Sequence, residues 1–228
     1  MTDEASVDYF GRHAPALLRF KTSQSLRARR AMFDEFLRLT GARPGQRVVD
    51  VGVTPDTSLA DSNAFVRFWP TKQTLTVTSI EDASNLESVF PGVTFVRTSG
   101  VTLPFEDGAF DVAHSSAVLE HVGDTEHQRT FVHEVCRVAK VVFLTTPNRW
   151  FPLELHTFLP LVHWLPQDRH QQVLRTVGLR FWAETDNLNL LSAQTLRELF
   201  PPEASISVHR HRLLGLTSNL VAAGATGG

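Results

Sequence analysis

Residues 47–52 read Arg-Val-Val-Asp-Val-Gly, a short β-branched run that ends in glycine. Such a run is typical of a strand buried on both faces of a sheet. A turn at residues 43–46 (Arg-Pro-Gly-Gln) precedes it. Before that turn, apolar residues recur at roughly helical spacing through residues 25–40, and Gly41 is suited to end a helix there. The stretch therefore predicts a helix, a turn and a buried strand in succession.

Four more short apolar runs follow, with helical patterns between them. They cover residues 75–79, 94–98, 110–115 and 141–145. Two of the intervening helices begin with a predicted capping box, Ser84 with Glu87 and Thr125 with Gln128. Strands that alternate with helices need crossover connections. The predicted fold is therefore α/β: a Rossmann-like, doubly wound, mostly parallel sheet with helices on both faces.

The C-terminal end has a different pattern. A helix is predicted over residues 192–200, and the extended runs 206–211 and 216–222 are separated by a short loop. This predicts a C-terminal antiparallel hairpin, followed by a frayed tail of small residues from 222 to 228. There is no internal repeat and no linker. We expect one domain over residues 1–228, with an N-terminal helical segment at 1–42 and an aromatic-rich insertion at 150–185.

Composition limits the partners and the compartment. Of 228 residues, 42% are hydrophobic and 20% charged, which is ordinary globular composition. A net charge of −2 gives no global attraction to nucleic acid, so no nucleic-acid partner is expected. No apolar run reaches the roughly 18–20 residues of a transmembrane helix, and charges interrupt the first twenty residues, so neither a membrane span nor a signal peptide is expected. The single Cys136 suits a reducing compartment, and the expected localisation is cytoplasmic.

Four segments resemble, in order, motifs of the class I S-adenosylmethionine-dependent methyltransferases. They are residues 48–52 (VVDVG), 103–112 (LPFEDGAFDV), 115–122 (SSAVLEHV) and 145–149 (TTPNR). The resemblance spans about residues 47–149. It implies the fold predicted above, S-adenosylmethionine as the cofactor, and methyl transfer as the reaction.

The resemblance also implies a cofactor site beyond the carboxyl ends of the strands, where ligands bind in such sheets. Gly52 has no Cβ and allows a close approach to a ligand. Glu81, after the second strand, can accept hydrogen bonds from both ribose hydroxyls. Residues 99–101 would hold the adenine edge. The implied cofactor site comprises Asp50, Gly52, Val53, Thr54, Glu81, Asp82, Ser99, Gly100, Val101, Ser115, Ser116 and His121.

Two features depart from the family pattern. The glycine-rich turn continues as Val53-Thr54-Pro55-Asp56, and Pro55 removes a backbone donor and fixes its φ. Asp56 would repel a carboxylate, although it could hold the α-ammonium group of the cofactor. Position 99 is Ser where the family often has Asp. These departures keep open a second reading, in which the protein is a methyltransferase-like binding or partner protein without activity.

Residues 150–182 hold three of the four tryptophans and follow the fifth strand, where this fold inserts its substrate lid. They predict a pocket for an apolar or ring-containing small-molecule acceptor, or alternatively a satellite core beneath a long connection. Residues 10–30 mix apolar and basic side chains. They are expected to help cover the acceptor, unless they form only a solvated helical face.

His156, beside Glu154, is the candidate general base, because imidazole can take a proton near neutral pH. A structural histidine is the competing interpretation. His156, His163 and His170 recur every seven residues, but Pro160 and Pro166 interrupt any common helix, so no metal site is expected.

The sequence thus predicts an S-adenosylmethionine-dependent methyltransferase acting on O or N of a small or lipid-like acceptor. Two alternatives remain: an inactive binding protein of the same fold, and an S-adenosylmethionine-using enzyme that does not methylate. The oligomeric state is not predicted.

Overall fold

The computed structural model describes residues 15–59, 61–213 and 215–227, with side chains from residue 26 onward. The sheet order is β3-β2-β1-β4-β5-β7-β6, with β1 to β5 parallel and β7 antiparallel to both β5 and β6. This confirms the predicted mostly parallel sheet with a C-terminal hairpin. The strands are β1 (Val48–Val51), β2 (Leu75–Ser79), β3 (Thr94–Arg97), β4 (Phe110–Ser116), β5 (Ala139–Pro147), β6 (Ser205–Leu213) and β7 (Leu216–Ala225).

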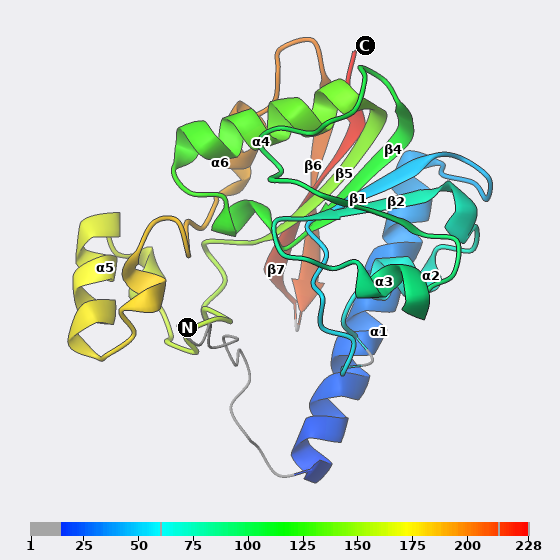
Figure 1. The fold of residues 1–228 in the computed structure, drawn as a ribbon. Coiled ribbons are helices and arrows are strands. Elements are labelled where there is room, and N and C mark those ends of the chain that lie inside the picture. The colour runs from blue at the N-terminus through cyan, green and yellow to red at the C-terminus, as the bar shows by residue number, and fades with distance from the viewer. Residues whose placement is uncertain (1–14, 60, 214, 228) are drawn as a thin grey trace, which may run out of the picture.

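Helices cover both faces of the sheet (Figure 1). One face packs on α4 (Thr125–Val138) and α6 (Ala193–Glu198), around buried Phe131 and Leu196. The other packs on α1 (Pro15–Thr40), α2 (Ala64–Phe68) and α3 (Asn85–Val89), around Phe36 and Trp69, both fully buried. All four residues of β1 are buried, as expected for a central strand with helices on either side.

The first helix is longer than predicted, since α1 begins at Pro15 rather than residue 25. Its end agrees with the prediction: Gly41 has φ +66° and donates to the Leu37 carbonyl. This left-handed residue after the last turn is the usual place for glycine.

Both capping boxes were predicted wrongly. The Ser84 side chain makes no cap hydrogen bond, and Glu87 accepts from the Phe95 amide instead. At α4 the cap is Asp124, one residue before Thr125, and it accepts from the amides of Glu126 and His127. A carboxylate one residue upstream thus satisfies the free amides of the first turn.

The tail was also predicted wrongly, because residues 222–225 belong to β7. Ala222 and Ala223 are buried and pair with Leu144 and Phe143 of β5. Gly224 leaves no room for a side chain, since a Cβ there would lie 2.0 Å from the Ser205 carbonyl oxygen. The small residues are therefore needed for close strand packing.

The predicted insertion lies between β5 and α6. It contains α5 (Gln167–Thr176) and two short 3₁₀ turns, Val162–Trp164 and Phe181–Ala183. Leu174 and Ala183 are buried, whereas Trp150, Phe158 and Leu161 are exposed. The insertion thus combines a small core of its own with an apolar surface. Within the described residues, no helix has both the length and the apolar character needed to span a membrane.

Candidate active site

The carboxyl ends of β1, β2, β4 and β5 lie at one edge of the sheet because these strands are parallel. Gly52 and Glu81 follow β1 and β2, and His121 lies in the 3₁₀ turn Leu119–His121 after β4. His156 lies in the insertion after β5. The fold therefore brings the predicted site residues to one edge, where ligands bind in open α/β sheets.

Asp50 lies inside the sheet and is already paired. It is 6% exposed, and its Oδ1 accepts from Nδ1 of His114 on β4 at 2.7 Å. The His114 ring stacks on Phe65, with ring centroids 3.9 Å apart. This buried contact joins β1 to β4 and fixes the end of β1, from which the following turn begins.

The two glycines predicted to touch the cofactor also lie close to protein side chains. A Cβ on Gly52 would lie 2.3 Å from Cγ2 of Val118, and Gly52 also has φ +96°. A Cβ on Gly100 would lie 2.2 Å from the Phe131 ring. Both positions therefore need glycine for packing within the protein.

In the loop that replaces the glycine-rich turn, the described residues 54–59 and 61–63 are held by hydrogen bonds among themselves and by the Asn85 side chain, which donates to the Pro55 carbonyl. The Thr54 amide donates to Asn63 Oδ1, and the Asn63 side-chain amide donates to the carbonyls of Thr54 and Asp56. Asp56 accepts from the Ser58 amide and the Ser62 hydroxyl. The hydrogen bonds from Ser58 lower the pKa of Asp56. The Asp56 carboxylate is thus engaged within the loop, and Val53 donates its amide to the Thr78 carbonyl.

Glu81 is exposed at the end of β2, and its carboxylate makes no hydrogen bond within the described part of the chain. The neighbouring Asp82 accepts from the Ser84 amide, which lowers its pKa. Of the two carboxylates, Glu81 is therefore the one free to take a ligand. Ser99 and Val101 are half-buried in the turn after β3.

The serines of β4 bond to neighbouring strands. Ser115 donates to the Val51 carbonyl at 2.8 Å, and the Ser116 hydroxyl lies 2.9 Å from that of Thr145. Ala117 then turns the chain with φ +55° into the Leu119–His121 turn. The strand end is thus rigidly placed before the residues that follow it.

Glu120, His121 and His156 form a cluster beyond β4 and β5. Glu120 is fully buried, and its Oε2 accepts from the Thr146 hydroxyl at 3.0 Å. Its Oε1 has no hydrogen-bond partner among the described residues, and His121 Nε2 lies 4.0 Å from it. The imidazoles of His121 and His156 pack edge to face, with centroids 4.9 Å apart.

Both imidazoles are oriented by hydrogen bonds at Nδ1. His121 donates to the Asn187 carbonyl at 2.6 Å, and His156 donates to Glu154 Oε1 at 2.6 Å. Glu154 is buried and also accepts from the amides of His156 and Thr157. Burial raises the pKa of Glu154, but these contacts outweigh it and lower that pKa to about 2. Burial lowers the pKa of His156, but the Glu154 carboxylate outweighs this effect and raises that pKa overall.

The remaining contacts fix this arrangement in place. Trp182 lies beside both imidazoles, and its ring centroid is 5.0 Å from that of His156 and 6.1 Å from that of His121. Gln128 of α4 donates to the carbonyls of Leu119 and Asn189, and the Asn189 amide donates to the Glu120 carbonyl. Hydrogen bonds from Gln128 and Asn189 therefore hold the segment that carries Glu120 and His121 in place.

Sequence reasoning found His121, His156, the adjacency of Glu154 and, within the aromatic stretch 150–182, Trp182, but it missed Glu120 and Asn187. The seven-residue spacing of His156, His163 and His170 did not indicate the cluster, because His163 bonds to the Phe151 carbonyl and His170 lies in α5. The signal available was a carboxylate next to a histidine at the end of a predicted strand. Residues 10–25, part of the predicted cover, lie outside the described side chains.

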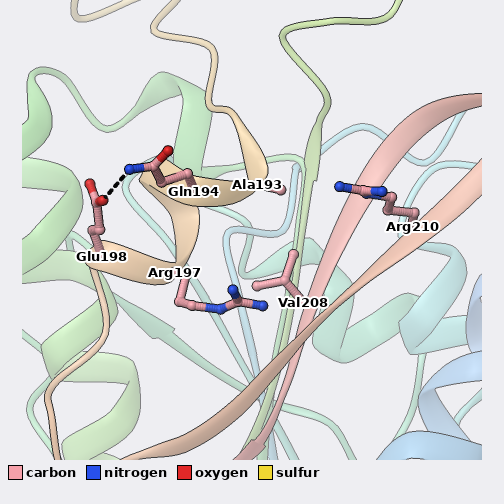
Figure 2. Close-up of a pocket in the computed structure, with 6 residues that line it drawn as sticks. All are labelled: Ala193, Gln194, Arg197, Glu198, Val208 and Arg210. Atoms are coloured by element: carbon pink, nitrogen blue, oxygen red, sulfur yellow. Dashed lines mark hydrogen bonds between the residues drawn. The ribbon is translucent and has the colours of Figure 1, made fainter.

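Two other features carry no chemistry of this kind. Burial raises the pKa of Cys136 to about 12, so its thiol stays protonated. A hollow of about 670 Å³ lies between α6 and β6 (Figure 2), lined by Ala193, Gln194, Arg197, Glu198, Val208 and Arg210. Gln194 and Glu198 bond to each other there, and the hollow contains no nucleophile.

The comparisons with known proteins agree with this fold. Residues 70–141 match the methyltransferase domain family. No curated protein matches the sequence. Among solved structures, magnesium protoporphyrin IX methyltransferase from Synechocystis PCC 6803 with bound S-adenosylhomocysteine has a TM-score of 0.59 at 14% identity, covering 95% of this chain and 91% of that one. The YcgJ protein from Bacillus subtilis has a TM-score of 0.56 at 18% identity, over 81% and 73%.

A third structure, a possible histamine N-methyltransferase from Thermotoga maritima, has a TM-score of 0.52 at 15% identity, over 92% of this chain and 91% of that one. The predicted Rossmann-like fold is therefore confirmed. The domain match and the shared fold together support the predicted enzyme class and its cofactor.

Proposed function

We propose that this chain, which has the fold of the class I S-adenosylmethionine-dependent methyltransferases, methylates an oxygen or nitrogen atom of a small acceptor held beside His156. One observation carries the proposal. The free Glu81 carboxylate and the oriented His121 and His156 imidazoles lie at the same carboxyl edge of the sheet.

The residues at this edge fit the cofactor unequally. Glu81 is exposed and unengaged, as a ribose-binding carboxylate must be before the cofactor arrives. At the turn after β1, Val118 packs on Gly52, so the methionine part must lie beside Val118 or displace it. When bound, S-adenosylmethionine supplies a methyl group already activated by its sulfonium, and the protein has mainly to orient the two partners and exclude water.

The role of the chain's own residues follows from the geometry. Because Nδ1 of His156 is committed to Glu154, its Nε2 is the nitrogen left to activate the acceptor. Trp182 offers an aromatic wall beside it, which suits an apolar or ring-bearing acceptor. Trp150 and Trp164, with ring centroids 6.2 Å apart, form a second exposed aromatic pair in the insertion.

A specific observation also favours a second candidate, a binding protein of this fold that does not methylate. The Thr54 amide and the Asp56 carboxylate are engaged within the loop, and Val118 packs against one side of Gly52. Both features reduce the backbone available for a cofactor.

Calorimetric titration with S-adenosylmethionine and S-adenosylhomocysteine separates the two candidates. We expect saturable heat with both ligands. Incubation with methyl-labelled cofactor and a panel of phenols, carboxylates and amines then tests transfer, with mass spectrometry of the product. Saturable binding with a cofactor-derived product that is not methylated would identify a different S-adenosylmethionine-using enzyme. Absence of binding would favour the inactive protein.

A further inference from the structure

We propose that Glu120, His121 and His156 bind a divalent transition-metal ion, for which Zn²⁺ is the best match. Each residue offers one ligand atom, and these atoms lie within 4.8 Å of one another. Whether the ion binds does not depend on methyl transfer. Only its role at the acceptor rests on the proposed function.

The first argument is the unpartnered oxygen of Glu120. The side chain is fully buried, and Oε1 makes no hydrogen bond while Oε2 takes the Thr146 hydroxyl. A buried carboxylate oxygen without a partner is costly, because it has lost its water and gained nothing in return. A cation beside Oε1 would supply the missing partner.

The second argument is the orientation of the two imidazoles. The Nδ1 atom of His121 is held by a backbone carbonyl, and that of His156 by a buried carboxylate. Outer partners of these two kinds are the ones that fix metal-binding histidines in the required tautomer. They leave the two Nε2 atoms, with their lone pairs, as the ligand atoms.

The third argument is the number and kind of ligands. Two imidazole nitrogens and one carboxylate oxygen form a three-ligand set that leaves a fourth, open position, as in catalytic zinc sites. Metal–ligand bonds of about 2.0–2.2 Å put tetrahedral ligand atoms about 3.4 Å apart. The Glu120 Oε1 to His121 Nε2 distance is 4.0 Å, so these two ligands would move together by only about half an ångström.

The site indicates the class of acceptor. A ring-bearing molecule can stack on Trp182 while its hydroxyl oxygen takes the fourth position. A bound divalent ion lowers the pKa of that hydroxyl, so its proton can leave to solvent before the oxygen is methylated. His156 then activates the acceptor through the ion rather than by taking the proton itself. An amine gains less, since it is already nucleophilic when neutral. The acceptor class is therefore a phenol or similar hydroxyl compound.

The test uses the untagged full-length chain, stripped with a chelator and titrated with Zn²⁺ or Co²⁺ alone. We expect saturation at about one ion per chain, with the visible absorption bands of tetrahedral Co²⁺. Loss of an outer partner weakens metal binding by roughly 100-fold at most. His121→Ala and His156→Ala each remove a ligand, so each should weaken binding by more than that. Glu154→Gln should weaken it by about 10–100-fold. The matched control is His133→Ala, which removes an exposed histidine of α4.

No saturable binding by the wild-type chain would overturn the metal site, as would His121→Ala and His156→Ala variants that bind like His133→Ala. Because His121 is partly exposed, its variant is expected to fold even if a Glu120 variant does not. A chain that binds S-adenosylmethionine but no metal would keep the proposed function and lose this site. A chain that binds Zn²⁺ but no S-adenosylmethionine would do the reverse.

Discussion

The turn after β1 and the cluster beyond β4 and β5 use their polar atoms in opposite ways. After β1, the Thr54 amide and the Asp56 carboxylate are engaged within the loop, and Val118 packs against one side of the exposed Gly52. In the cluster, Glu120 Oε1 has no partner and two imidazoles are held at one nitrogen only. Family resemblance pointed to the first region and also to His121, whereas the unpartnered Glu120 oxygen points to the second region. The two regions therefore predict different binding sites, and variants in each of them can tell the two predictions apart.

The largest effect is expected in the cluster. His156→Ala should lower the rate of methyl transfer by about 10²–10⁴-fold, because it removes the group that activates the acceptor. The affinity for S-adenosylmethionine should stay within about twofold, since His156 lies beyond β5 rather than β2. Turnover and calorimetry measure the two quantities, with His133→Ala as the control. A parallel loss of cofactor affinity would mean that the two regions are one site.

A large effect on stability is expected at the turn after β1. Gly52→Ala should lower the free energy of unfolding by about 2–4 kcal/mol, since the new Cβ meets Val118 and φ is left-handed. Val118→Ala should recover part of that loss in the double variant. Urea denaturation of the four proteins gives the coupling between the positions. If Val118→Ala gave no recovery, the need for glycine would come from the left-handed backbone of Gly52 and not from contact with Val118.

A smaller effect is expected at the end of β2. Glu81→Ala should weaken S-adenosylmethionine binding by at least about tenfold, the low end for a charge-assisted hydrogen bond. Its Tm should hardly change, because the carboxylate is exposed. Asp82→Ala is the matched control. Should Asp82→Ala prove the more damaging variant, the ribose contact would be reassigned to Asp82.

The smallest effect is expected in the loop 54–63. Asp56→Asn should lower Tm by a few degrees at most and leave cofactor affinity unchanged, because the carboxylate serves Ser58 and Ser62. Its pKa in the folded protein lies below the ordinary 3.8, so its contribution is present at neutral pH. That contribution is lost as the pH falls through the lowered pKa, and the two Tm curves should converge once the pH is below it. A clear loss of affinity would show that Asp56 holds the cofactor.

The fold was readable because its signals are local. β-branched runs such as residues 75–79 mark buried strands wherever they occur, and β2 has those bounds. Helix caps were less readable, since Asp124 and Thr125 are both good capping residues and only geometry decides between them. Only part of the cluster was predicted from the sequence, namely His121 and His156, and nothing predicted that they lie beside each other and Glu120. Glu120, His156 and Asn187 are far apart in the sequence, and nothing local shows that an oxygen is left without a partner.

One short turn touches both regions. Val118 packs on Gly52, and Glu120 and His121 follow it within the same turn. A shift of Val118 on cofactor binding would therefore move Glu120 and His121, which lie beside the proposed acceptor position. Linkage makes such an effect reciprocal: whatever factor the cofactor adds to acceptor affinity, the acceptor adds to cofactor affinity. Cofactor and acceptor would then bind cooperatively rather than independently, and the order in which they arrive would leave the total free energy unchanged.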